Sequence, residues 1–191
     1  MIIMFIGPSS SGKDFFYEKT LKKYDFSEII LLTTRPKRVN EVEGKEYYFI
    51  DNETMDKLDK NGNLIERRDY ETVNGIWSYA TRGDNINLDK NYLVINTWEA
   101  YKSYINYFGK DVVYPFYFEM NPNIRFERAY EREKKQEKKN YLEMCRRFIA
   151  DNEDFTDYWI EKYNPIIINN DGSIDETEKQ IDENIKKLIK K

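Results

Sequence analysis

The 191-residue chain has no histidine and only one cysteine, Cys145. Histidine is the commonest general base and metal ligand, so any chemistry must use carboxylates, cations, hydroxyl groups or backbone amides. A single cysteine excludes an internal disulfide and any zinc site built from several cysteines, and it suits a reducing compartment. Cys145 is therefore expected to be a small residue on a helix face.

The chain also lacks long apolar runs and an excess of positive charge. Its apolar opening, MIIMFI, has no basic leader and stops at Gly7 and Pro8, too early for a signal peptide or a membrane span. The net charge is −4, whereas broad nucleic-acid binding needs a basic surface. We expect one domain in the cytoplasm, a monomer or homodimer that binds neither membranes nor nucleic acid.

What the chain does contain is an alternation of short apolar runs and helical segments. The runs are typical of strands buried on both faces, and they lie at 2–6, 28–32, 92–96, 112–119 and 165–169. Helices are expected at 13–24, at 97–108, within 122–163, and after Ser173, which can form a capping box with Glu176. This order predicts an α/β fold in which helices cover a parallel sheet.

Two segments interrupt the alternation. Residues 35–82 carry short strand-like pieces, among them YYFI and NLIERR, separated by the turn signals Asn61-Gly62 and Asn74-Gly75. We expect this segment to be a small insertion at the rim of the sheet. Residues 128–139 combine dense mixed charge with few apolar anchors, which is typical of a solvated helix face and also of a weakly packed, mobile element.

The stretch FIGPSSSGKDFF, residues 5–16, places a glycine, four residues and then Gly-Lys between a strand and a helix. In such a loop the backbone N–H groups point inward, the helix N-terminus favours anions, and the lysine reaches the β- and γ-phosphates of a nucleotide. The alternative is a glycine-rich turn with a surface lysine. The nucleotide contacts are expected from Gly7, Ser9, Ser10, Ser11, Gly12 and Lys13.

Asp14 stands where such loops usually have a serine or threonine that meets magnesium. A carboxylate is a stronger magnesium ligand, but it would repel the phosphates without the ion. We predict an active loop that depends unusually strongly on magnesium, with Asp14 as the metal ligand. The alternative is that Asp14 only favours the helix N-terminus electrostatically.

A second anionic site is indicated by the segment TTRPKRVNEVEGKEYYFID, residues 33–51. Arg35, Lys37 and Arg38 follow a core strand within four positions of one another. Arginine suits a terminal phosphate because its planar fork pairs with two oxygens at once. Beside a phosphate loop, this cluster indicates a phosphate-bearing acceptor.

Taken in order, these motifs resemble the guanylate kinase family. The likeness covers nearly the whole chain: GPSSSGK, TTRPKR with EVEGKEYYF, Glu66, YAT, an Arg-x-x-x-Arg pair, a later arginine and a final strand ending in Asn-Asn-Asp. The resemblance implies a P-loop core (1–34, 83–125 and 146–191), a nucleoside monophosphate-binding insertion (35–82) and a mobile lid (126–145). It also implies phosphoryl transfer from ATP, with Mg²⁺, to GMP or dGMP.

The resemblance also assigns roles to particular residues. Arg35, Arg38 and Tyr47 would hold the acceptor phosphate, helped by Tyr79 and Thr81, and Glu66 would accept hydrogen bonds from the guanine edge. Arg128, Arg132 and Arg146 would close over the phosphates together with Lys13, and Asn169 would lie near the donor adenine. These roles suit a protein without histidine, since phosphoryl transfer needs positioning and positive charge more than a proton relay.

Several features depart from the family pattern. Leu31 stands where the family usually has a serine that touches the base, and Asn96 stands where an acidic residue is expected near the metal or acceptor. The spacings from Glu66 to YAT and from Arg132 to Arg146 are longer than the family pattern leads us to expect. Three short segments resemble those of the ribose 1,5-bisphosphate phosphokinases instead: GKD (12–14), VIN (94–96) and NNDGS (169–173). Those enzymes have no base to recognise, so Glu66 and the complete TTRPKR–EGKEYYF segment favour a nucleotide acceptor. A third alternative, an inactive module that binds phosphorylated peptides, should show an eroded phosphate loop.

Overall fold

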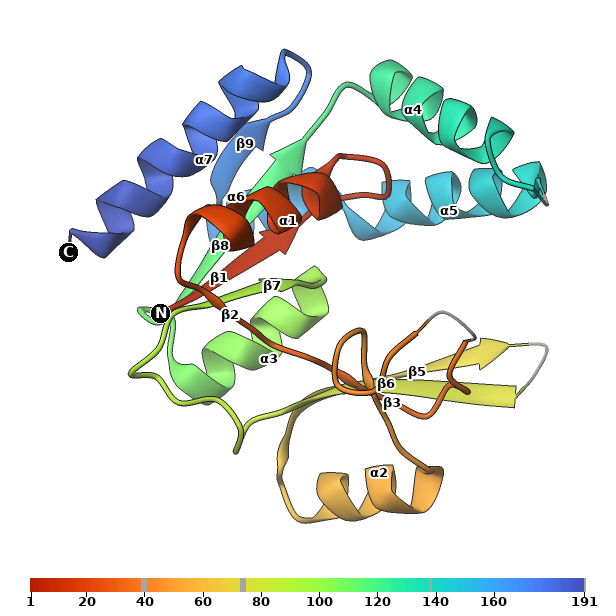
Figure 1. Ribbon diagram of the computed structural model, residues 1–191, viewed down its shortest axis with the longest axis vertical. Helices are drawn as coiled ribbons and strands as arrows, with labels where there is room; N and C mark the ends of the chain where they lie inside the picture. The colour runs from red at the N-terminus through yellow and green to blue at the C-terminus, as the bar shows by residue number, and fades with distance from the viewer. Residues whose placement is uncertain (39–40, 73–74, 138, 191) are drawn as a thin grey trace.

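The computed structural model describes residues 1–38, 41–72, 75–137 and 139–190, and its core is a five-stranded sheet. The strand order is β2-β7-β1-β8-β9, and neighbouring strands run parallel throughout. The strands are β1 (Ile2–Ile6), β2 (Ser27–Glu28), β7 (Tyr92–Ile95), β8 (Val113–Glu119) and β9 (Ile166–Asn169). The predicted α/β class with a helix-covered parallel sheet is confirmed (Figure 1).

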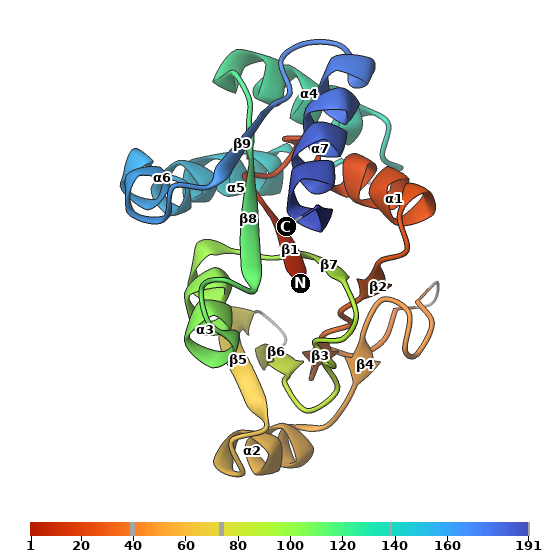
Figure 2. The same cartoon turned by 90° about the vertical axis from the view of Figure 1, so that its left-hand side faces the viewer.

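Helices cover both faces of this sheet (Figure 2). On one side lie α1 (Lys13–Lys23) and α7 (Ile174–Ile189), and on the other lie α3 (Trp98–Phe108) and α6 (Asp157–Tyr163). Because side chains alternate along a strand, Ile3 and Phe5 of β1 pack toward the first pair, whereas Ile2, Met4 and Ile6 pack toward the second. All five are fully buried, so β1 anchors both halves of the core.

A second, mixed sheet forms the predicted insertion, below the core in Figure 1. Its strand order is β4-β3-β6-β5. The strands are β3 (Leu32–Thr33), β4 (Tyr48–Phe49), β5 (Leu64–Thr72) and β6 (Gly75–Arg82). Helix α2 (Asn52–Lys60) closes one side of the sheet and buries Met55 against Leu32 and Ala80.

Two further helices, α4 (Pro122–Lys134) and α5 (Tyr141–Asp154), lie beyond the end of the core sheet (Figure 1). Asn121 caps α4 by accepting a hydrogen bond from the Asn123 backbone, and Pro122 begins the helix where no N–H is needed. The two helices meet through an edge-to-face contact between Phe126 and Phe148, with ring centres 5.4 Å apart. The exposed Cys145 lies on α5, as expected for a cysteine on a helix face.

The structure differs from the sequence-based expectations in two places. The apolar run 28–32 divides between sheets, because β2 joins the core while β3 pairs with β6. Helix α2 was not anticipated, although Asp51 caps it by accepting from the Thr54 backbone. The expected turn at Asn61-Gly62 is present, and Asn74 lies outside the described residues. The Ser173–Glu176 capping box is confirmed.

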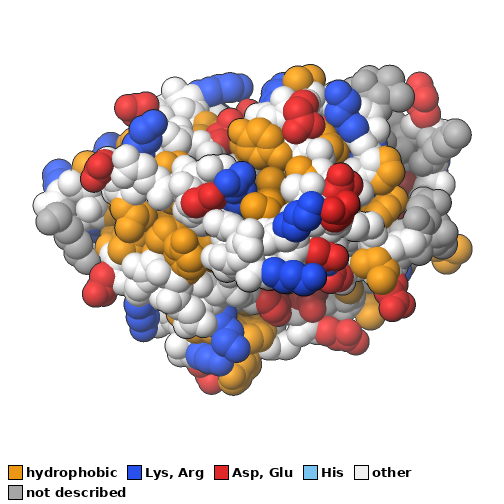
Figure 3. All heavy atoms as spheres, turned by 90° about the horizontal axis from the view of Figure 1, so that it is seen from below, with side chains coloured by type: hydrophobic (Ala, Val, Ile, Leu, Met, Phe, Trp, Pro, Cys, Tyr) orange, Lys and Arg blue, Asp and Glu red, His pale blue; other side chains and the backbone are white. Residues whose placement is uncertain are grey.

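Within the described ranges, no helix has the length and apolar character that crossing a bilayer requires. Figure 3 views the molecule from the end that carries the insertion. On this face the coloured side chains of Lys and Arg are interspersed with Asp and Glu rather than gathered into one basic field.

Candidate active site

The phosphate loop joins β1 to α1 through a tight, partly left-handed turn. Ser10 and Gly12 have φ of 65° and 88°, and Gly12 caps α1. A Cβ on Gly12 would lie 2.4 Å from Asn170 Nδ2, so both the backbone conformation and the space require glycine. The predicted loop therefore has the backbone turn that a phosphate cradle needs.

The turn after β9 holds this loop from one side. Asn170 Nδ2 donates a 2.8 Å hydrogen bond to the Ser11 carbonyl, and Thr177 Oγ1 donates to Asn170 Oδ1 at 3.0 Å. Asn170 is buried, whereas Asn169 is exposed and bonds to Asp171 and Gln180. Asn170, which the sequence did not single out, thus supports the loop, and the predicted adenine contact, Asn169, lies in a separate groove against α7.

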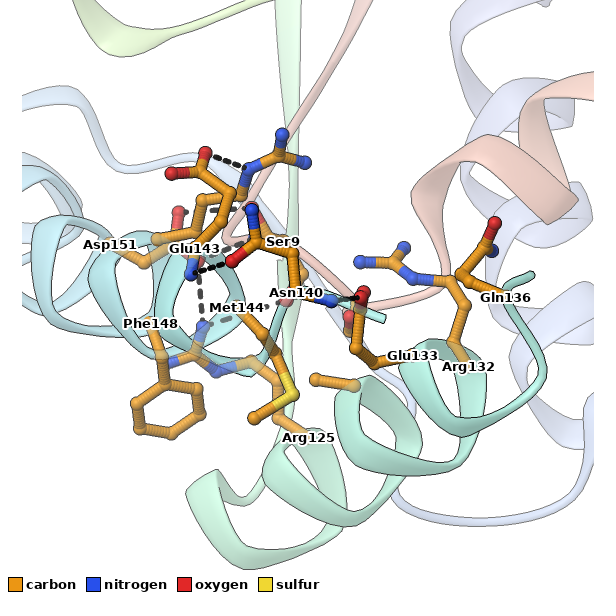
Figure 4. A pocket seen from close by; sticks show the side chains of 13 residues that line it. Ser9, Arg125, Arg132, Glu133, Gln136, Asn140, Glu143, Met144, Phe148 and Asp151 are labelled. Carbon is orange, nitrogen blue, oxygen red and sulfur yellow. Dashed lines mark hydrogen bonds and ion pairs between the residues drawn. The ribbon is translucent and has the colours of Figure 1, made fainter. Parts of the chain in front are cut away.

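Helix α5 holds the loop from the other side through Asp151 (Figure 4). The Ser9 backbone N–H donates to Asp151 Oδ2 at 2.9 Å, and Arg125 Nη1 from α4 donates to the same oxygen at 2.8 Å. The Arg125 guanidinium lies 3.8 Å from the centre of the Phe148 ring. Burial lowers the pKa of Arg125, and Asp151 only partly offsets this, so the pair is firmly enclosed.

Lys13 is folded back onto its own loop. Its Nζ donates to the Pro8 carbonyl at 3.1 Å. Burial lowers the pKa of Lys13, and the charges of Asp14 and Asp151 act in the opposite direction. Among the described residues, the buried Oγ atoms of Ser10 and Ser11 have no hydrogen-bond partner. The loop therefore offers an ammonium group and two unpaired hydroxyls to an anionic ligand.

A cavity of about 400 Å³ lies between the loop and helices α4 and α5. Figure 4 shows Arg132 pointing from α4 into this space. Arg147 also lines the cavity, whereas Arg146 lies outside it and is 65% exposed. Hydrogen bonds from Arg146 and Arg147 lower the pKa of Glu143 to about 2. Arg128 instead donates to the Asn170 carbonyl at 3.3 Å, beside the loop.

A second cleft, of about 370 Å³, connects the loop to the insertion. Its lining includes Lys13 of the loop and a tyrosine wall from the insertion, formed by Tyr47, Tyr70 and Tyr79. Tyr79 packs edge-on against both other rings, with centres 5.6 and 5.7 Å apart. Asn96 also lines the cleft, and its Nδ2 has no hydrogen-bond partner within the described part of the chain.

From the β5–β6 hairpin, Arg68, Tyr70 and Tyr79 line this cleft. Glu66 lies opposite Thr81 and Arg68 opposite Tyr79, so these four side chains share one face of the hairpin. The Glu66 carboxylate accepts from Thr81 Oγ1 at 2.8 Å and from Arg68 Nε at 2.8 Å. Tyr104 of α3 donates to Thr81 and ties this face to the core.

The two arginines predicted to hold the acceptor phosphate have different surroundings. Arg35 is only 4% exposed, and its Nη2 donates to Glu41 Oε1 at 2.6 Å. Its guanidinium carbon lies 5.5 Å from the centre of the Tyr47 ring. Donating this hydrogen bond to Glu41 raises the pKa of Arg35. Arg38 is exposed, and its backbone N–H donates to the same carboxylate.

Asp14 lies exposed in the first turn of α1, beside a hollow that also borders Tyr47. In the described ranges no three His, Cys, Asp or Glu side chains gather as a metal site. Magnesium is usually held through one or two carboxylates together with substrate phosphates and water, so such a cluster is not required. Asp14 lines this hollow, whereas Ser10 lines the cavity beside α4 and α5, so the role of Asp14 as a magnesium ligand stays a prediction.

The residues missed by sequence reasoning had weak signals. Asp151 lies at helical spacing from the buried Met144 and from Phe148, so a charged residue on an apolar face was the available clue. Arg68 follows Glu66 by two positions, which in a strand places both on one face. Arg147 and Asn170 are each one position away from a residue that was named.

Comparisons with known proteins agree with this arrangement. The guanylate kinase family model matches residues 1–91. A guanylate kinase of Streptococcus thermophilus is 36% identical over 72 residues, which is 37% of this chain and 34% of the relative. One from Anaplasma phagocytophilum is 29% identical over 117 residues, covering 59% of this chain and 55% of the relative. The alignments thus span between about a third and just over half of these two relatives.

The crystal structure of guanylate kinase from Anaplasma phagocytophilum has a similar fold. It superposes with a TM-score of 0.63 at 22% identity, covering 98% of this chain and 85% of that one. The sequence matches and the shared fold rest on largely independent observations, the first on local residue identity and the second on the path of the backbone. Together they show that residues 1–91 are similar in sequence to guanylate kinases and that the chain has the fold of a guanylate kinase.

Proposed function

We propose that the protein transfers the γ-phosphate of Mg-ATP to GMP or dGMP. The observation that carries the proposal is the single cleft that runs from Lys13 to the tyrosine wall of the insertion. Phosphoryl transfer requires the donor and acceptor phosphates to meet in line, and it demands little covalent chemistry from the protein. The activity would belong to purine nucleotide metabolism in the cytoplasm.

On the donor side, Lys13 and the loop amides would hold the ATP phosphates, with Asp14 and the free hydroxyls of Ser10 and Ser11 around the ion. Bound magnesium would neutralise charge that develops during transfer. Arg128, Arg132 and Arg146 would complete the positive charge when the lid, 126–145, closes. Arg147 supports this arrangement from the cavity wall.

On the acceptor side, Arg35, Arg38 and Tyr47 would anchor the phosphate, which then competes with Glu41 for the Arg35 guanidinium. Tyr79 and Thr81 would help to hold this phosphate, Asn96 would contact the acceptor, and Glu66 would lie at the guanine edge. The acceptor phosphate oxygen is itself the nucleophile, so a strong general base is not needed. The insertion, 35–82, would swing toward the core as substrates bind.

A coupled assay of ADP release tests the proposal with GMP, dGMP, AMP, UMP and ribose 1,5-bisphosphate as acceptors. We expect GMP and dGMP to be preferred. The second candidate is ribose 1,5-bisphosphate, favoured by the cationic Arg68 in the cleft, which can pair with a second phosphate. A preference for ribose 1,5-bisphosphate would overturn the assignment of GMP or dGMP as acceptor. No ADP release with any of the five acceptors at ample magnesium would favour a binding module.

A further inference from the structure

The far wall of the acceptor cleft contains an ion pair, Arg68 with Glu66. Arg68 Nε donates to Glu66 Oε2 at 2.8 Å and Nη2 to Oε1 at 3.4 Å. The Glu66 side chain is 4% exposed and the Arg68 side chain 21% exposed. Arg68 lines the cleft, whereas Glu66 does not. The arginine therefore covers the carboxylate and is the member of the pair that a ligand meets.

The atoms that Arg68 uses for this pair leave a second edge unused. Nε and one Nη2 proton face Glu66, and Nη1 has no hydrogen-bond partner among the residues that the structure describes. A guanidinium carries five donors in a rigid plane, so Nη1 and the second Nη2 proton form a free two-donor edge. Burial alone would lower the pKa of Arg68, but the charge of Glu66, the neighbouring Tyr70 and the hydrogen bond to Glu66 together raise it.

Three of the roughly four acceptor positions of the Glu66 carboxylate are occupied. Oε1 already accepts from Thr81 and from Arg68, and Oε2 accepts from Arg68. Thr81 in turn is held by the Tyr104 hydroxyl at 3.2 Å. This buried network fixes Glu66, and Glu66 fixes the direction of the arginine fork.

We infer that Arg68 determines the specificity of the acceptor site by donating to O6 and N7 of the purine, with Glu66 and Thr81 as positioning residues. This inference rests on the proposed function. Guanine presents two acceptors, O6 and N7, on the edge that suits an arginine fork. Adenine presents a 6-amino donor at the corresponding place, which the donors of Arg68 would oppose. Leu31, an apolar residue on the same cleft, offers no competing hydrogen bond from its side chain.

Acceptor analogues test this inference on the wild-type protein. In 7-deaza-GMP the N7 acceptor is missing, and we expect kcat/KM to fall about tenfold relative to GMP. AMP should be about a hundredfold worse. IMP keeps O6 and N7 and lacks only the 2-amino group, so its kcat/KM should stay within a few-fold of that for GMP. A larger loss with IMP than with 7-deaza-GMP would show that Glu66 reads the base directly, and would overturn the inference.

Arg68→Lys provides the second measurement, because it keeps the charge beside Glu66 and removes the fork. We expect the ratio of kcat/KM for GMP to that for 7-deaza-GMP to fall to about one. Arg67→Lys is the matched control: Arg67 is the next residue on the opposite face, paired with Asp56 and Asp69. The control should keep the wild-type ratio. An Arg68→Lys variant with the wild-type ratio would overturn the inference.

These outcomes separate the inference from the proposed function. A wild-type protein that phosphorylates GMP but treats 7-deaza-GMP alike overturns only the role of Arg68. A wild-type protein that phosphorylates none of the purine monophosphates overturns the proposed function, and the inference with it.

Discussion

The phosphate loop and the acceptor wall are built in opposite ways. The loop is one continuous segment, Gly7–Lys13, and the groups that it would offer under the proposed function are chiefly backbone amides and the side chains beside them. The acceptor wall is assembled across the β5–β6 hairpin, where Arg68 faces Tyr79 and Glu66 faces Thr81. A site made by the backbone is set by conformation, whereas a site made by cross-strand side chains can change its ligand through one substitution.

The two sites are also held differently. Distant elements hold the loop, since Asp151 from α5 and Asn170 from the end of β9 bond to its backbone. The acceptor pair is held chiefly within its own hairpin by Thr81, with Tyr104 as the link to the core. Movement of α5 would therefore disturb the loop directly, and movement of the insertion would chiefly disturb the Arg68–Glu66 pair.

The first prediction has the largest expected effect and concerns the lysine of the phosphate loop. Lys13→Met should lower kcat about a thousandfold, because it removes the cation that would neutralise the transferring phosphate. Thermal stability should hardly change, because burial already disfavours the charged form. The measurements are the coupled assay and a melting curve. Lys22→Met, in the exposed last turn of the same helix, is the control. Retention of more than a tenth of the activity would contradict the role.

The second prediction concerns the side chains that hold the loop. Arg125→Met leaves Asp151 buried without its cation, so the free energy of unfolding should fall by about 3 kcal/mol. The double variant Arg125→Met/Asp151→Ala should lose less than the sum of the two single variants, because the two residues interact directly. Urea unfolding measures these losses, with the exposed Glu153→Ala on α5 as control. Additive losses would argue against coupling through this pair.

The third prediction has the smallest expected effect and tests whether the loop uses the Asp14 side chain as well as Lys13. Asp14→Ser should raise the magnesium concentration for half-maximal activity a few-fold, because a charged ligand is replaced by a neutral hydroxyl. If Asp14 only favours the helix N-terminus, stability should instead fall by about 0.3–1 kcal/mol with the metal requirement unchanged. Glu18→Gln, one turn later on α1, is the control.

Much of the fold could be predicted because its signals are local. The strand β1, the glycine turn, the start of α1 and the Ser173 capping box each depend on a few neighbouring residues. Other features depended on distant partners. The run 28–32 divides because Leu32 pairs with Ala80, and α2 forms where Met55 finds a buried place against the second sheet. Neither partner can be identified from the run itself.

The sequence by itself determined the phosphate loop, since glycine conformation, the strand before it and the helix after it all follow from adjacent residues. The tertiary structure decided which of two neighbours reaches each site: Arg147 rather than Arg146 on the cavity wall, and Asn170 rather than Asn169 on the loop. One step along a helix turns a side chain by about 100°. One step along a strand reverses its face. Only packing fixes these directions, and packing also brought Arg68 over Glu66.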